Sequence, residues 1–279
     1  MKIEKINLLH LRNYSHFQFH TEFRDLVELH NKELRKLYEK AGSDILDKVN
    51  IYNEKNPKHK IAFPLFLKSV EKYENSKTKI MIFGQETNSW YGTYGKEATA
   101  EYIMNCYEEF LTEGLPYHKG FFCKGVREFM KLWENKTGKE VGYLWNNIVK
   151  IGYASKNAGK AGFPRKFYDD IVKPSLNGII IEEIKILKPD YIVFLTGPRY
   201  YHIVNDVFGT PKRELVKGFK ANELCEIIIS NEKVSSVKRT FRTYHPGYLQ
   251  RRSKAVRENY YSKIIEEITQ DLNNKGGSK

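Results

Sequence analysis

Four short segments of the chain each place polar side chains directly after an apolar, β-rich stretch. They are Gly84-Gln85-Glu86-Thr87-Asn88, Leu144-Trp145-Asn146-Asn147, Phe194-Leu195-Thr196-Gly197 and Tyr244-His245-Pro246-Gly247-Tyr248-Leu249-Gln250-Arg251-Arg252. The carboxyl ends of parallel strands meet at one edge of a sheet, and open α/β folds bind ligands there, so we expect these groups to share one site. A carboxylate and an imidazole in one site supply a base and a hydrogen-bond donor. The sequence therefore predicts chemistry that involves Glu86 and His245.

The elements that would position these segments alternate between strand and helix patterns from residue 79 onward. We expect strands at 79–83, 142–146, 190–196, 224–230 and 238–244, and helices at about 97–111, 125–134, 167–187, 198–208 and 252–272. Such alternation predicts an α/β fold with a mainly parallel central sheet flanked by helices.

The residues before the first strand predict an N-terminal helical lobe. The expected landmarks are an N-cap at Thr21, a helix stop at Gly42, a second helix after Ser43 and a third near Pro64. The polar stretch 74–77 marks the expected boundary. We therefore divide the chain into an N-terminal helical lobe packed on the core, residues 1–77, and an α/β domain, residues 78–279.

The composition favours a polyanionic partner and disfavours a metal site. The chain of 279 residues carries 47 Lys and Arg against 34 Asp and Glu, which leaves a net charge of +13. Such a charge most commonly attracts nucleic acid. The three cysteines, Cys106, Cys123 and Cys225, lack the spacing of a disulfide framework or of a zinc or iron–sulfur site. No apolar stretch approaches the roughly 20 residues of a membrane span, so we expect a cytoplasmic protein, most simply a monomer.

Three of the four segments resemble, in their order and spacing, motifs of the uracil-DNA glycosylase superfamily, and the resemblance covers about residues 78 to 270. The first is similar to the Gly-Gln-Asp-Pro-Tyr water-activating loop, with Glu86 at the catalytic aspartate. The second is similar to the strand that ends in the base-reading asparagine, for which the register favours Asn147. The third is similar to the His-Pro-Ser-Pro-Leu loop, with His245 and Leu249 in the places of the histidine and the leucine wedge.

The resemblance implies a uracil-DNA glycosylase-like three-layer sandwich with an N-terminal helical extension, and a DNA glycosylase that needs no metal or cofactor. Cleavage of an N-glycosidic bond creates positive charge on the sugar and negative charge on the departing base. Glu86 would orient or deprotonate water and stabilise the sugar cation, while a neutral His245 would donate a hydrogen bond to the base. Asn147 would read the edge of a flipped uracil or modified pyrimidine.

The other expected contacts surround these three residues. The expected base-binding residues are Gln85, Asn88, Asn147, Trp90 and Tyr91, and the expected DNA-binding residues are Tyr248, Leu249, Arg251, Arg252, Lys156, Lys160 and Arg165. Leu249 would enter the duplex as a wedge while the cations hold phosphates. Thr87 and Asn88 replace the usual Pro-Tyr, whose tyrosine blocks the methyl group of thymine in relatives, so a base substituted at its fifth position is an expected alternative substrate.

Two other functions stay open at the level of sequence. One is a non-catalytic nucleic-acid-binding module in which the glycosylase pocket is degenerate, as the altered positions Thr87 and Asn88 suggest. The other is a metal-dependent nuclease built on Glu183 near Asp190. Ordinary structural roles also exist for the main candidates: Glu86 at a helix start, Asn147 in a turn and Leu249 in the core.

Overall fold

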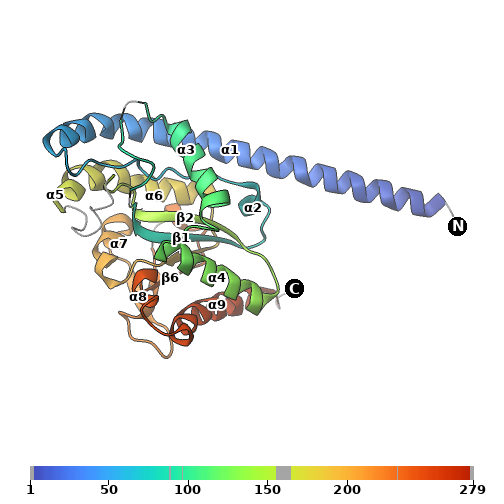
Figure 1. Ribbon diagram of the computed structural model, residues 1–279. Helices are drawn as coiled ribbons and strands as arrows, with labels where there is room; N and C mark the ends of the chain where they lie inside the picture. Colours follow the sequence, from blue (N-terminus) through green and yellow to red (C-terminus); the bar gives the residue numbers. More distant parts are fainter. Residues whose placement is uncertain (1–2, 88, 96, 155–164, 231, 277–279) are drawn as a thin grey trace.

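The computed structural model describes residues 3–87, 89–95, 97–154, 165–230 and 232–276 (Figure 1). Its centre is a six-stranded sheet in the order β2-β1-β3-β6-β5-β4. The strands are β1 (Lys79–Glu86), β2 (Gly142–Val149), β3 (Tyr191–Phe194), β4 (Lys212–Leu215), β5 (Leu224–Ile228) and β6 (Arg239–Thr243).

The first four strands of this order run parallel, while β5 and β4 are antiparallel additions at one edge. The prediction of an α/β fold with a mainly parallel sheet is therefore confirmed. Every residue of β3 is buried, as is expected for a strand covered on both faces. The sequence did not predict β4, because its four residues are all exposed and mostly charged, which is typical of an edge strand.

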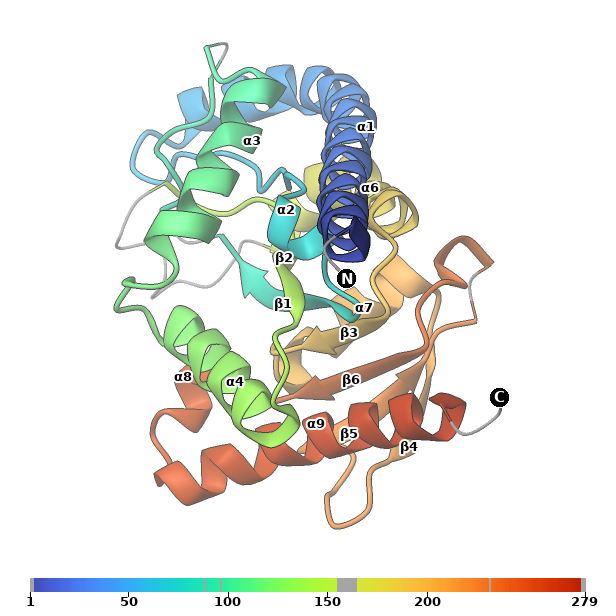
Figure 2. The ribbon, with the colours of Figure 1, turned by 90° about the vertical axis from the view of Figure 1, so that its right-hand side faces the viewer.

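Helices cover both faces of the sheet. They are α1 (Ile3–Lys55), α2 (Glu71–Glu74), α3 (Ala100–Glu109), α4 (Phe121–Thr137), α5 (Arg165–Phe167), α6 (Lys173–Leu187), α7 (Tyr201–Phe208), α8 (Pro246–Leu249) and α9 (Lys254–Gly276). Figure 2 shows α4 and α9 on one side of the sheet and α1, α3 and α6 on the other. The buried face of α4 presents Val126, Phe129 and Trp133, which recur at helical spacing and explain why the segment forms an amphipathic helix.

The N-terminal segment differs from the expected set of short helices. A single helix, α1, runs through both Thr21 and Gly42, and its first turns project beyond the rest of the chain (Figure 1). Packing against α6 outweighs the low helix propensity of Gly42. The helix expected near Pro64 is instead extended chain, since the Leu65 N–H donates to the carbonyl of Lys150 at 2.6 Å.

A buried polar network joins α1 and α6 to the end of β2. The side chains of Lys150 and Glu183 are 1% and 0% exposed, and their charged groups lie 2.6 Å apart. Asn146 Nδ2 donates to Glu183 at 2.8 Å, and the Tyr38 hydroxyl donates to the same carboxylate at 2.6 Å. Burial lowers the pKa of Lys150, and the neighbouring Glu183 carboxylate opposes that change. This network fixes α1 to the body of the molecule.

Among the helices of the described segments, none is long and apolar enough to cross a bilayer. The cysteines Cys106, Cys123 and Cys225 are buried free thiols.

Asp190, which the sequence had paired with Glu183 in a possible nuclease site, accepts the backbone N–H of Lys79 at 2.8 Å and pairs with Lys238. The burial of Glu183 in its ion pair with Lys150 therefore contradicts the nuclease hypothesis.

Candidate functional site

A cavity of about 710 Å³ opens where β1, β2 and β6 end. Glu86, Asn147 and His245, which the sequence placed at three separate strand ends, all line it. Seven Phe, Trp and Tyr side chains form much of its wall: Trp90, Tyr91, Phe110, Phe121, Phe122, Trp145 and Tyr153. A concave site of this volume, with apolar walls and a few polar groups, is typical of a pocket for a small organic ligand or a single base.

The pairing of β1 with β2 explains how the Asn147 amide reaches the cavity. Gly84 lies opposite Asn147 in the parallel register. A Cβ atom on Gly84 would lie 2.4 Å from Asn147 Oδ1 and 3.0 Å from the ring of Phe122. Only glycine permits this close approach, so Gly84 is part of the site although it has no functional group.

The Asn147 amide is oriented by its neighbour on the same strand. Trp145 Nε1–H donates to Asn147 Oδ1 at 3.0 Å, and Asn147 Nδ2 is buried with no hydrogen-bond partner among the described residues. The side chain therefore offers an unsatisfied donor in a site that it lines, which a ligand carbonyl would satisfy. Asn146 points the other way, into the network with Glu183 and Lys150.

Glu86, the last residue of β1, is held by a tyrosine from the neighbouring strand end. The hydroxyl of Tyr200, in the short helical turn Pro198–Tyr200 after β3, donates a short hydrogen bond to Glu86 Oε2. Burial raises the pKa of Glu86 above its ordinary value of 4.5, and the Tyr200 hydrogen bond opposes that rise. Catalytic acids and bases are frequently carboxyl groups of this kind, which lie largely buried in a cleft and have a raised pKa.

His245 follows β6 and caps the first turn of α8. Its Nδ1 accepts the backbone N–H of Gly247 at 3.0 Å, so in the neutral ring the proton is on Nε2. Burial lowers the pKa of His245 to about 4. The ring lies almost parallel to Phe122, with centroids 6.1 Å apart and an interplanar angle of 21°. At neutral pH the site thus holds an uncharged imidazole with one N–H donor.

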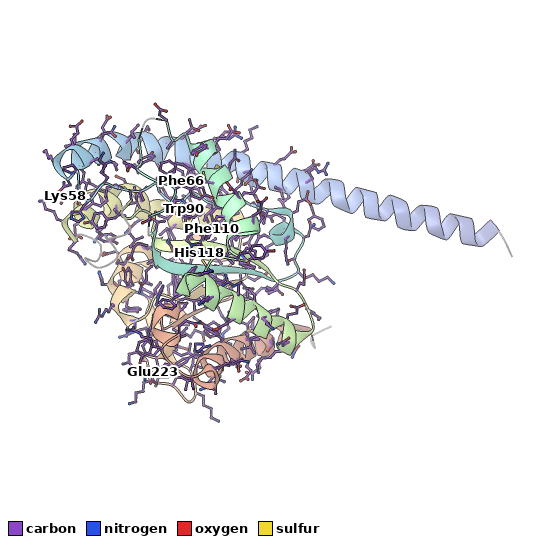
Figure 3. All side chains as sticks on the ribbon, viewed as in Figure 1. Lys58, Phe66, Trp90, Phe110, His118 and Glu223 are labelled. Atoms are coloured by element: carbon purple, nitrogen blue, oxygen red, sulfur yellow. The ribbon has the colours of Figure 1, made fainter. Side chains whose placement is uncertain are left out.

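The aromatic side chains pack against one another around these polar groups. Trp90 lies nearly perpendicular to Trp145, with centroids 5.2 Å apart, and packs edge to face on Phe110 at 5.1 Å. Phe110 in turn packs on His118, so Trp90, Phe110 and His118, all labelled in Figure 3, form one contiguous wall. Trp90 and Tyr91, both predicted to bind the base, line the cavity, and Trp90 Nε1 is a second buried donor with no partner among the described residues.

The predicted wedge residue is not where the resemblance placed it. Leu249 is 0% exposed and belongs to the hydrophobic core. It ends the short helix α8, and its N–H bonds back to the carbonyl of His245 at 3.2 Å. This turn directs the side chain inward, so the expectation of an exposed Leu249 is wrong.

The other predicted residues divide into four groups. Gln85 lines the cavity, and its Nε2 donates to the Thr196 carbonyl at 2.8 Å. Arg251 and Arg252 are exposed, and their guanidinium groups lie 5.9 and 4.8 Å from the ring centroid of Tyr248. Arg165 pairs with Asp169 at 2.8 Å and does not line the cavity. The predictions for Asn88, Lys156 and Lys160 lie outside the described residues.

Among the contributors that the sequence did not predict are Tyr200, Phe122 and the lining residues Phe110, His118 and Phe121. Tyr200 comes shortly after the strand-end segment Phe194-Leu195-Thr196-Gly197, for which the sequence indicates no residue with a role. Phe122 is the second residue of α4, after the N-cap Gly120 and the first helical residue Phe121. A glycine before an aromatic pair at a helix start is the only available signal, and it does not distinguish a pocket wall from ordinary core packing.

No protein-family model matches the chain, and no curated protein is significantly similar to it. Within the described segments, no group of three or more His, Cys, Asp or Glu side chains is arranged to hold a metal ion. What the site offers chemically is therefore a carboxylate, an amide donor and a neutral imidazole N–H in an aromatic cavity.

Proposed function

We propose that this protein is a DNA glycosylase that hydrolyses the N-glycosidic bond of an extruded uracil or modified pyrimidine. One observation carries the proposal: Glu86, Asn147 and His245, far apart in the sequence, line one cavity of about 710 Å³. Their chemical types match the demands of the reaction, and their order along the chain is that of the resembling motifs.

The proposed reaction uses the two ionisable groups for opposite charges. As the bond between C1′ and the base nitrogen breaks, its electron pair leaves with the base and the sugar becomes cationic. The Glu86 carboxylate stabilises that cation and orients water, whose oxygen bonds to C1′ while the carboxylate takes its proton. The Nε2–H of His245 donates to a carbonyl of the departing base, where negative charge develops. The departed base then takes up the proton that Glu86 removed from the water.

Base recognition in this proposal depends on Asn147 and the aromatic walls. The unpaired Nδ2 donor of Asn147 suits a pyrimidine carbonyl, and its Oδ1, which accepts only Trp145 Nε1–H, retains capacity for a ring N–H. Aromatic side chains such as Phe122 supply surfaces for stacking. The cavity volume leaves room for a substituent on the base, which supports modified pyrimidines alongside uracil.

The test is base release from a panel of oligonucleotides. Single strands and duplexes that carry uracil or 5-substituted pyrimidines are incubated with the protein in EDTA, and abasic sites are detected by alkaline cleavage. Glu86→Gln and His245→Ala should each reduce release by about 100-fold or more. Glu113→Gln and His202→Ala, which change exposed residues outside the cavity lining, serve as matched controls and should retain activity.

The burial of Leu249 favours a second candidate, a non-catalytic module that binds nucleic acid without extruding a base. That candidate predicts salt-dependent DNA binding that Glu86→Gln leaves unchanged, together with no base release from any member of the panel. Release of a free base by the wild-type protein would exclude it.

A further inference from the structure

The inward orientation of Leu249 leaves the proposed glycosylase without its expected wedge. Proteins that unstack a duplex frequently insert an exposed apolar group between the bases, and in a base-extruding enzyme such a group beside the pocket would occupy the space that the base leaves. Among the seven Phe, Trp and Tyr residues of the cavity wall, Phe121 is the most exposed, at 56%.

The position of Phe121 is fixed by well-packed elements. It is the first residue of α4, after the N-cap Gly120, and α4 is anchored through its buried face. Gly125, one turn further on, approaches the turn that carries His245 so closely that a Cβ atom there would lie 2.5 Å from Pro246. Phe121 itself lies beside that turn, since a Cβ atom on Gly247 would be 3.7 Å from Phe121 Cδ2.

The surroundings of Phe121 are those of a group that meets a polyanion. Lys119 and Lys124, the nearest cations in sequence, are both exposed. Arg251 and Arg252 are exposed in the segment that follows α8, whose first residue, Pro246, packs on α4. An exposed apolar ring with cations close to it in the chain can insert among bases while the cations contact phosphates.

We propose that Phe121 enters the base stack of duplex DNA in the space vacated by the extruded base. This assignment rests on the proposed glycosylase function and moves the wedge from the loop after β6 to the N-terminus of α4. The ring stands at the rim of the cavity, next to the side from which His245 contacts the base. Extrusion and leaving-group stabilisation are thereby coupled through the contact between α4 and α8.

The assignment predicts a defect that depends on the strandedness of the substrate. Single-turnover base release is measured on one sequence, presented as a duplex and as a single strand. Phe121→Ala should slow release from the duplex by about tenfold or more and change release from the single strand by less than about threefold, because only the duplex must be unstacked. Phe121→Leu, which keeps an apolar wedge, should restore most of the duplex rate.

Two controls separate this effect from a general loss of structure. Leu215→Ala, which removes an exposed apolar side chain from β4, should leave both rates unchanged. A 2-aminopurine placed beside the target base reports unstacking directly. Its fluorescence should rise when Glu86→Gln binds the duplex and should stay low when Glu86→Gln/Phe121→Ala binds.

The outcomes for the wedge assignment differ from those for the glycosylase proposal. Equal duplex rates for wild type and Phe121→Ala, or equal losses on both substrates, would overturn the wedge assignment while leaving the glycosylase proposal intact. A wild-type protein that releases no base from either substrate would overturn the glycosylase proposal, and the wedge assignment with it.

Discussion

Each of the three polar groups at the cavity has its hydrogen-bonding state set by a neighbour. Tyr200 holds the Glu86 carboxylate, Trp145 orients the Asn147 amide, and the backbone N–H of Gly247 fixes the tautomer of His245. Such preorganisation lets a site stabilise developing charge without rearranging during the reaction. The supporting residues are therefore as informative to mutate as the reacting ones.

Substitution of Tyr200 should alter the pH dependence of base release. In the proposed reaction the Glu86 carboxylate acts in its ionised form, so activity should fall as the pH drops through its pKa, which burial places above 4.5. The Tyr200 hydrogen bond opposes that rise, and Tyr200→Phe should therefore move the acid limb of the kcat profile to higher pH. Loss of carboxylate positioning should also reduce kcat by about tenfold or more at the optimum.

The matched control is Tyr201→Phe, which removes a hydroxyl bonded to the Pro211 carbonyl outside the cavity. Its acid limb should coincide with that of the wild type. An unshifted limb in Tyr200→Phe would contradict the assignment of Glu86 as the ionising group.

At the scale of elements, the sequence predicted most of what buried apolar residues determine. The sequence predicted β1, β2 and β3 because continuous apolar runs such as Ile80-Met81-Ile82-Phe83 are typical of strands that are buried on both faces of a sheet. Tertiary packing decided the rest. The continuity of α1 through Gly42, the extended chain at Pro64 and the inward turn of Leu249 depend on partners distant in sequence.

The join between α1, α6 and β2 should be costly to break. Glu183→Gln leaves the ammonium group of Lys150 buried without its counter-charge, and such changes cost roughly 3–5 kcal/mol. Tyr38→Phe keeps the ion pair but removes two hydrogen bonds, the one donated to the same carboxylate and the one accepted from the Leu67 N–H at 3.0 Å, so its cost should be smaller, about 2 kcal/mol. Urea unfolding monitored by circular dichroism measures both free energies, and equal losses would contradict the role given to the ion pair.

At the scale of the whole molecule, the net charge of +13 should govern encounter with DNA. Association of a cationic protein with DNA releases counterions, so the logarithm of the binding constant should fall linearly with the logarithm of salt concentration. Arg251→Ala and Arg252→Ala should each lower the magnitude of that slope by about one, as expected for the loss of one phosphate contact.

Lys48→Ala is the control for this measurement, since it removes an exposed charge from α1, which contributes no residue to the cavity lining. Its slope should match that of the wild type. A slope that stays unchanged in both arginine variants would place the DNA contact on another surface.

In the proposed reaction a carboxylate, an amide and an imidazole meet around one extruded base, and the bond of that base to the sugar breaks. Mass spectrometry of the free base released in a single turnover tests this reaction directly, with wild-type protein and Glu86→Gln compared on the best substrate of the panel. We expect stoichiometric release by the wild type and a rate lower by about 100-fold or more in Glu86→Gln. Undiminished release by Glu86→Gln, or no free base from any substrate with the wild type, would contradict it.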